Sequence, residues 1–334
     1  MDLTTDYLGL RLRNPLVASA SPLSQSVAGV QRLADAGIGA VVLPSLFEEQ
    51  LRREADRDAR LAEAGTDSFA ESLSYLPPTA DVEAGSSQYL SLLSRAVAAV
   101  DVPVIASLNG VTAAGWADHA TAMQDAGAAA IELNIYYLPG DPEVSGREVE
   151  QRHLDILARV KSVVSVPVAV KLSPYFSSTG AVARRLAESG ADGLVLFNRF
   201  MQPDIDPERL AVTSGVQLSS RAEARMPRSW IALLRERVTA SLAATTGVED
   251  AGDVAAYLLA GADVVMTASA LLRHGPQHTG VLLAGLTDWM NRKGFTSVDQ
   301  ARGLLSVPCT SDGSAYERAG YLAAIQQATI RYGS

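Results

Sequence analysis

The sequence of 334 residues contains a single cysteine, Cys309, and only four histidines. One cysteine cannot form a disulfide within the chain, and it cannot supply the cluster that an iron–sulfur or zinc centre needs. His274 and His278 have the spacing of one helix face, but no third ligand stands near them, and no HExxH motif is present. We therefore expect neither a disulfide framework nor a metal site.

The sequence also lacks a long apolar run. Its richest apolar stretch, Ala36–Phe47, is interrupted by glycine, proline and serine and is too short to cross a bilayer. The N-terminus has early acidic residues and no apolar core of signal-peptide length. A net charge of −9 disfavours nucleic-acid and anionic membrane surfaces, but it leaves room for a local basic pocket for a phosphate. We expect a soluble, cytoplasmic protein.

Short apolar runs, separated by helical stretches, predict eight buried strands. The predicted strands are Pro15–Ala20, Ala40–Ser45, Pro103–Leu108, Ala130–Tyr136, Pro167–Ser173, Gly193–Asn198, Ser241–Gly247 and Asp263–Ser269. Eight strands that alternate with helices predict an α/β fold, a closed (β/α)8 TIM barrel. Four of the joints read alike, DAGIGA, DAGAAA, ESGADG and LAGADV, each with a glycine suited to a left-handed helix cap. An open doubly wound sheet explains this repeat less well.

Two connections are too long for plain barrel joints. After the second strand, Glu48–Ala64 is charge-dense and predicted to be helical, and Gly65–Ser87 is rich in serine, proline and glycine. After the sixth strand comes Arg199–Pro227. Both are candidate lids over a site. We assign residues 1–308 to the barrel and 309–334 to a tail, whose helix at Tyr316–Gln327 packs either across the barrel or onto a second subunit.

Polar side chains stand at the carboxyl ends of the predicted strands, where barrels build their sites. The run Val166–Val170 ends in Lys171. A lysine there is costly unless an anionic or hydrogen-bonding group meets it, or unless it reaches solvent. Asn109, Asn134 and Asn198 follow other strands. A lone asparagine is typical of a turn, but three with a lysine favour a planar ligand whose ring edge alternates donors and acceptors.

Small-residue turns follow the last two strands, Thr246–Gly247 and Ala268–Ser269. In barrels, backbone N–H groups at these turns form a phosphate cradle, although small residues there also allow tight packing of helix on strand. The cradle, the asparagines and Lys171 together indicate flavin mononucleotide (FMN), with Lys171 stabilising negative charge at its N1/O2 edge. No GxGxxG follows the first strand, so no dinucleotide site is expected.

From about Leu3 to Pro308 the chain resembles the dihydroorotate dehydrogenase family of flavin-dependent barrels. The resemblance is carried by NPLVASAS, ELNIY, VPVAVKLSPYF, VLFN and LAATTGVEDAGDVAAYLLAGADVVMTASALLRHGP. ELNIYYLPGDPE, LFNRFMQPDID and YERAGY place it nearer a dihydroorotate-dehydrogenase-like branch. The family implies an FMN oxidoreductase that converts (S)-dihydroorotate to orotate in pyrimidine biosynthesis, and a homodimer.

The resemblance implies a nearly complete FMN site. Its members are Ser19, Ala20, Ser21, Asn109, Asn134, Lys171, Ser220, Thr246, Gly247, Ala268 and Ser269. Ser220 falls where the family has a glycine, and the family usually has glycines at Thr246 and Ala268. The last two departures are small because backbone amides bind the phosphate.

The substrate site departs further from the family. In NIYYLP, Tyr137 stands where the family has a catalytic cysteine or serine, and Pro139 replaces an asparagine. Pro44 stands where the family has a second lysine. Tyr137 is therefore either the acid/base, acting with Lys171, or a wall of a differently shaped pocket.

The substrate-binding residues that the resemblance implies are Asn134, Asn198 and Arg199, where Arg199 replaces a small hydroxyl residue. Arg199 either meets a substrate carboxylate or forms a surface ion pair.

Four hypotheses for the function follow. The first is an FMN-dependent dehydrogenase that acts on a CH–CH group, with dihydroorotate as the family's substrate. The second keeps the flavin and changes the small planar substrate. The third is a non-catalytic flavin-binding partner subunit, and the fourth an aldolase-type barrel with Lys171 as Schiff-base former. The electron acceptor is open, and a separate electron-transfer subunit is one alternative.

Overall fold

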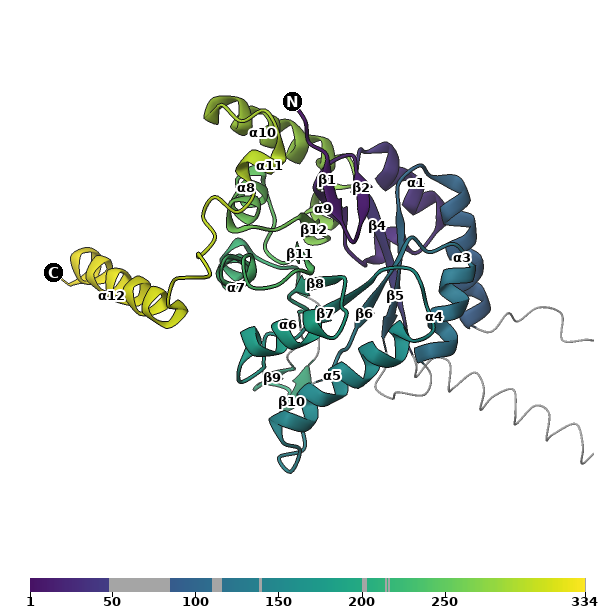
Figure 1. The fold of residues 1–334 in the computed structure, drawn as a ribbon, viewed down its shortest axis with the longest axis horizontal. Coiled ribbons are helices and arrows are strands. Elements are labelled where there is room, and N and C mark those ends of the chain that lie inside the picture. Colours follow the sequence, from purple (N-terminus) through teal and green to yellow (C-terminus); the bar gives the residue numbers. More distant parts are fainter. Residues whose placement is uncertain are drawn as a thin grey trace, which may run out of the picture.

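The computed structural model describes residues 1–47, 85–109, 116–137, 140–199, 203–213, 215 and 217–333. At its centre eight parallel strands close into a barrel in the order β11-β12-β3-β4-β5-β6-β7-β8 (Figure 1). The strands are β3 (Leu16–Ala18), β4 (Ala40–Phe47), β5 (Val104–Asn109), β6 (Ala130–Asn134), β7 (Val168–Leu172), β8 (Gly193–Leu196), β11 (Ser241–Ala244) and β12 (Val264–Thr267). The predicted (β/α)8 barrel is confirmed, and all eight predicted strands are present.

The barrel strands are buried on both faces, which explains their near-continuous apolar runs. In β7 every residue is buried. Val168, Val170 and Leu172 face the helices, whereas Ala169 belongs to the cluster inside the barrel. Since side chains alternate along a strand, Lys171 points into the barrel with Ala169. The pleat therefore puts the one charged residue of this strand on its inner face.

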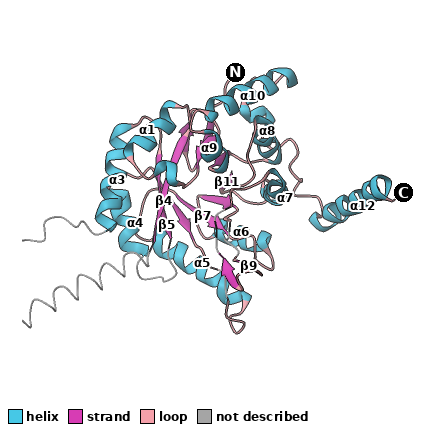
Figure 2. Ribbon diagram, turned by 180° about the vertical axis from the view of Figure 1, so that it is seen from behind, coloured by secondary structure: helices cyan, strands magenta, loops and turns pink. Residues whose placement is uncertain are grey.

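Helices cover the outside of the barrel (Figure 2). They are α1 (Val27–Asp35), α3 (Gly85–Ala99), α4 (Trp116–Asp125), α5 (Gly146–Lys161), α6 (Thr179–Glu188), α7 (Arg225–Leu234), α8 (Ala251–Ala260), α9 (Ser269–His274), α10 (His278–Lys293) and α11 (Val298–Ala301), with short 3-10 turns η1 (Pro22–Ser24) and η2 (Arg221–Ala224). The glycines of the four similar joints, Gly37, Gly127, Gly190 and Gly261, all have positive φ. The repeat was thus correctly interpreted as a helix-capping joint.

An N-terminal hairpin, which the sequence analysis did not predict, contributes to the barrel interior. β1 (Thr5–Tyr7) pairs with β2 (Leu10–Leu12). Tyr7, Leu8 and Leu12 join the same buried cluster as the inward-facing barrel residues. An added Cβ at Gly193 would lie 2.5 Å from a methyl group of Leu8. Only glycine at the start of β8 therefore leaves room for the side chain of Leu8.

The long connections are partly described. Glu48–Ala64 and most of Gly65–Ser87 lie outside the described residues. The connection after β8 carries a hairpin of β9 (Asp204–Asp206) and β10 (Ala211–Thr213). The predicted tail helix lies within α12 (Gly313–Tyr332), which stands away from the barrel (Figure 1). Its packing onto a second subunit stays a prediction. Among the described helices none is both long and apolar enough for a membrane span.

Candidate active site

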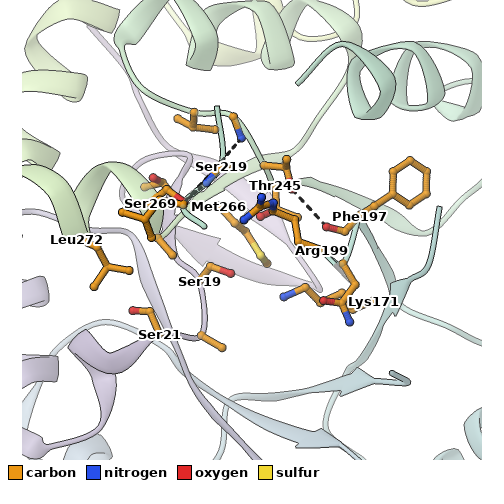
Figure 3. Close-up of a pocket in the computed structure, with 18 of the residues that line it drawn as sticks. Ser19, Ser21, Lys171, Phe197, Arg199, Ser219, Thr245, Met266, Ser269 and Leu272 are labelled. Atoms are coloured by element: carbon orange, nitrogen blue, oxygen red, sulfur yellow. Dashed lines mark hydrogen bonds between the residues drawn. The ribbon is translucent and has the colours of Figure 1, made fainter. Parts of the chain in front are cut away.

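A cavity of about 240 Å³ opens at the carboxyl ends of β3, β7, β8, β11 and β12 (Figure 3). Most of the residues predicted to form the site line it. They are Ser19, Ala20, Ser21, Lys171, Asn198, Arg199, Thr246, Gly247, Ala268 and Ser269. Five segments far apart in the sequence thus meet at one end of the barrel, as parallel strands require.

Lys171 lies at the inner side of this cavity and is 8% exposed. Its Nζ lies 3.3 Å from Oε1 of Glu132, which is 1% exposed. Glu132 is on β6, two residues from Ala130 of the inner cluster, so its side chain also points into the barrel. The ion pair offsets the cost of burying the ammonium group. The sequence analysis missed Glu132, although a carboxylate within an otherwise apolar strand was a visible signal.

One end of the cavity is built from the turn after β11 and the start of α9. Thr246 and Gly247 have φ values of 84° and 71°. The amide of Gly247 donates to Oγ of Ser219 at 3.2 Å, and this hydroxyl lies 2.9 Å from Oγ of Ser269. Ser219 is buried and lines the cavity, whereas the predicted Ser220 is exposed, with its amide and hydroxyl bonded to Glu223. Ser219 is a site residue that the sequence analysis missed.

The two helix starts near this end differ. Asp250 caps α8, and its carboxylate accepts from the amides of Gly252 and Asp253. That carboxylate already satisfies the first amides of α8, so they do not serve an anionic ligand. In contrast, no side chain caps α9, which begins at Ser269 in the cavity wall. An anionic end of a ligand is therefore best met by the start of α9 and by the hydroxyl of Ser219 beside it.

The predicted asparagines form part of a hydrogen-bond chain beside the cavity. The side-chain amide of Asn198 donates to Oδ1 of Asn134, and the amide of Asn134 donates to Oγ of Ser45 at 3.3 Å. Ser45 is 2.8 Å from the hydroxyl of Ser107. Asn198 lines the cavity, whereas Asn134 and Asn109 are not among its lining residues. Asn109 is 5% exposed at the end of β5.

Tyr137 is placed apart from the cavity. The guanidinium of Arg152 lies 4.0 Å above the centre of its ring, and the ring packs against the core between strands and helices. Pro139 lies outside the described residues. Pro44 is half-buried within β4, directly before Ser45. The role of Tyr137 as acid/base therefore stays a prediction.

Arg199 lines the cavity and is also paired. Its Nε donates to Glu223 at 3.0 Å, and Nη1 donates to the carbonyl of Gln217. Its side chain is 38% exposed. The ion pair that the sequence analysis weighed is thus present, and the guanidinium stands at the cavity where it can also meet an anion.

One further feature bears on what the cavity can hold. The cavity wall combines serine hydroxyls at one end with the Lys171 ammonium group at its inner side (Figure 3). The arrangement suits an extended ligand with an anionic tail and a planar, hydrogen-bonding ring.

Comparison with known proteins matches most of the chain to one family. The family model described as dihydroorotate dehydrogenase matches residues 2–290. The catalytic subunit of dihydroorotate dehydrogenase B (NAD(+)) of Methanothermobacter thermautotrophicus is 26% identical over 90% of this chain and 98% of its own length. The putative dihydroorotate dehydrogenase A (fumarate) of Aeropyrum pernix is 26% identical over 74% of this chain and 88% of its own.

A relative that is named for a different activity is also found. The chloroplastic dihydropyrimidine dehydrogenase (NADP(+)) of Arabidopsis thaliana is 24% identical over 90% of this chain and 76% of its own.

Proposed function

The chain belongs to the dihydroorotate dehydrogenase family, whose model spans residues 2–290, and from this premise we propose that it is an FMN-dependent oxidoreductase acting on a CH–CH group. The first candidate reaction is oxidation of dihydroorotate to orotate. The observation that carries the proposal is a buried lysine at the inner side of a cavity whose opposite end is made of serines and a glycine turn.

The residues present fit FMN. Ser219 and the uncapped start of α9 at Ser269 would hold its phosphate, and the Gly247 turn would support Ser219 through the hydrogen bond from its amide. Ser19–Ser21 line the cavity and would meet the polar edges of FMN. When bound, FMN supplies the hydride acceptor of the reaction. Lys171 would stabilise negative charge at the pyrimidine edge of the flavin, because an ammonium group attracts a negative charge more strongly in a site that is largely shielded from water.

We keep Tyr137 as the candidate acid/base. The sequence position supports this role, because Tyr137 stands where the family resemblance implies a catalytic cysteine or serine, and the guanidinium of Arg152 lies 4.0 Å above its ring. The same contact supports the alternative that Tyr137 is a wall residue. Asn198 and Arg199, which line the cavity, are the candidates for holding the substrate.

A second candidate is a different small planar substrate. Pro44 and Tyr137 replace two groups that the family resemblance implies for dihydroorotate, and one relative is named for dihydropyrimidine oxidation. We also propose a separate electron-transfer subunit, since relatives are named as catalytic subunits of an NAD(+) enzyme. A homodimer and a cytoplasmic location remain our expectations from the family.

A substrate panel tests the proposal. The purified protein is mixed without oxygen with dihydroorotate, dihydrouracil and dihydrothymine, and the flavin absorbance is followed. Bleaching by dihydroorotate supports the first reaction, and bleaching by another compound alone supports the second. A flavin that dithionite reduces but no dihydropyrimidine reduces favours a non-catalytic partner subunit.

A further inference from the structure

Glu132 stands directly below the proposed flavin site without being part of its wall. It is 1% exposed and lies on the inner face of β6. β6 pairs with β7, and Lys171 is opposite Asn134, two residues along the strand from Glu132. Lys171 lines the cavity and Glu132 does not. Lys171 therefore has the cavity on one side and a carboxylate on the other.

The contact between them engages only part of the carboxylate. Nζ of Lys171 meets Oε1 at 3.3 Å, which is long for a charge-assisted hydrogen bond. Oε2 is buried and has no partner among the described residues. An unpaired carboxylate is costly to bury, because its charge loses its hydration. A carboxylate at this depth is therefore held in place by Lys171, and it holds Lys171 in turn.

The N-terminal hairpin of β1 and β2 adds a second buried polar group near Glu132, the side chain of Tyr7. The hydroxyl of Tyr7 is buried and unpartnered in the described part of the chain. Burial and the negative charges of Glu132 and Asp263 raise the pKa of Tyr7. Tyr7 therefore stays a neutral phenol within electrostatic reach of Glu132. Lys171 is the cation that the structure pairs with Glu132. This ion pair is therefore the main determinant of the net charge in this part of the barrel interior.

We propose that Glu132 is the positioning residue of Lys171: it fixes the ammonium group beneath the pyrimidine edge of the flavin and offsets part of its charge, which lowers the flavin reduction potential. This inference rests on the proposed function. A nearby positive charge favours the electron-rich flavin, so the potential rises when the lysine acts alone and falls when the lysine is lost.

The test compares reduction potentials of the FMN-loaded variants by dithionite titration against a redox dye. Glu132→Gln keeps the shape of the side chain and removes its charge. We expect its potential to rise by about 30 mV, which is a tenfold change in the equilibrium ratio of a two-electron couple. Lys171→Met should lower the potential. A merely structural role would move both variants in the same direction, towards free FMN.

Asp192→Asn is the matched control. Asp192 pairs with Lys161 at 2.7 Å and directly precedes β8, at the opposite end of the barrel from the cavity. This variant loses a lysine–carboxylate pair and should keep the wild-type potential. If Glu132→Gln does not fold, Glu132→Asp retains the charge but withdraws it by one methylene. Its potential should rise less, and its dissociation constant for FMN should increase several-fold.

The outcomes separate the inference from the proposed function. A wild-type protein that takes up no FMN overturns both. A wild-type protein that binds FMN, with Glu132 variants of unchanged or lower potential, overturns the inference alone. A raised potential in the Glu132 variants, with a lowered one in Lys171→Met and no change in Asp192→Asn, establishes it.

Discussion

The hydroxyl of Ser219 lies 2.9 Å from the hydroxyl of Ser269, and the amide of Ser219 donates to the same Ser269 hydroxyl at 3.0 Å. The pair joins the segment before η2 to the first turn of α9. The carbonyl of Ser219 also accepts from Arg273 at 2.7 Å. Ser219 is thus fixed on both sides, and its position determines the shape of the end of the cavity that would receive an anionic group.

Ser219→Ala should weaken FMN binding about tenfold, which corresponds to the roughly 1.4 kcal/mol of one hydrogen bond lost at a buried group. Fluorescence titration of the apoprotein with FMN measures this. Ser220→Ala is the matched control, because Ser220 is exposed and bonds to Glu223. A larger loss in Ser220→Ala than in Ser219→Ala would show that the phosphate end is assigned to the wrong serine.

Gly247→Ala should destabilise the protein by about 1–3 kcal/mol, since Gly247 has positive φ. An added Cβ would also lie 2.7 Å from the carbonyl oxygen of Ser220. Gly280→Ala is the control in α10, where an added Cβ meets nothing within 4 Å, and it should stabilise by about 0.5–1 kcal/mol. Urea unfolding compares the two variants. Equal effects would contradict a strained turn at Gly247.

The barrel could be predicted because two-sided burial makes each strand a short apolar run, and a helix cap demands glycine at fixed places. Lys171 could be found for the same reason, as a charge in such a run. The choice between Ser219 and Ser220 could not be made, because the backbone of an irregular connection decides which of two neighbours points inwards. The direction in which the Tyr137 side chain points could not be predicted for the same reason, since Tyr137 lies beyond the end of β6 at Asn134.

Arg199→Ala should raise KM for dihydroorotate about tenfold with a smaller change in kcat. The reason is that it removes a charge that holds the substrate equally well in the ground state and in the transition state. Arg209→Ala is the control on the β9–β10 hairpin, where Arg209 pairs with Asp206 and is 81% exposed. Steady-state kinetics with each candidate substrate measures the effect. An unchanged KM in Arg199→Ala would leave the arginine as an ion-pair residue of Glu223.

His153 predicts a pH dependence of stability. It is fully buried, and burial lowers its pKa from the ordinary value of 6.5 because the charged ring is disfavoured there. Below pH 6.5 the unfolded chain takes up a proton that the folded chain does not. The free energy of unfolding therefore falls as the pH drops through this value, by at most about 1.4 kcal/mol per pH unit, until the folded pKa is reached.

His153→Phe removes this titration, and the apolar ring suits a site beside Phe176. Its unfolding free energy should change less between pH 7 and pH 5 than that of the wild type. Urea unfolding at several pH values gives both slopes. Parallel slopes would mean that His153 takes up its proton in the folded protein at the same pH as in the unfolded chain.

The central claim is that this barrel end binds FMN through Lys171 and the Ser219–Ser269 end. The most direct test is the FMN content of the protein purified from cells, measured by absorption together with uptake by the stripped apoprotein. The account predicts about one FMN per chain in the wild type and a much reduced content in Lys171→Ala. A wild-type protein that is colourless and takes up no added FMN would contradict it.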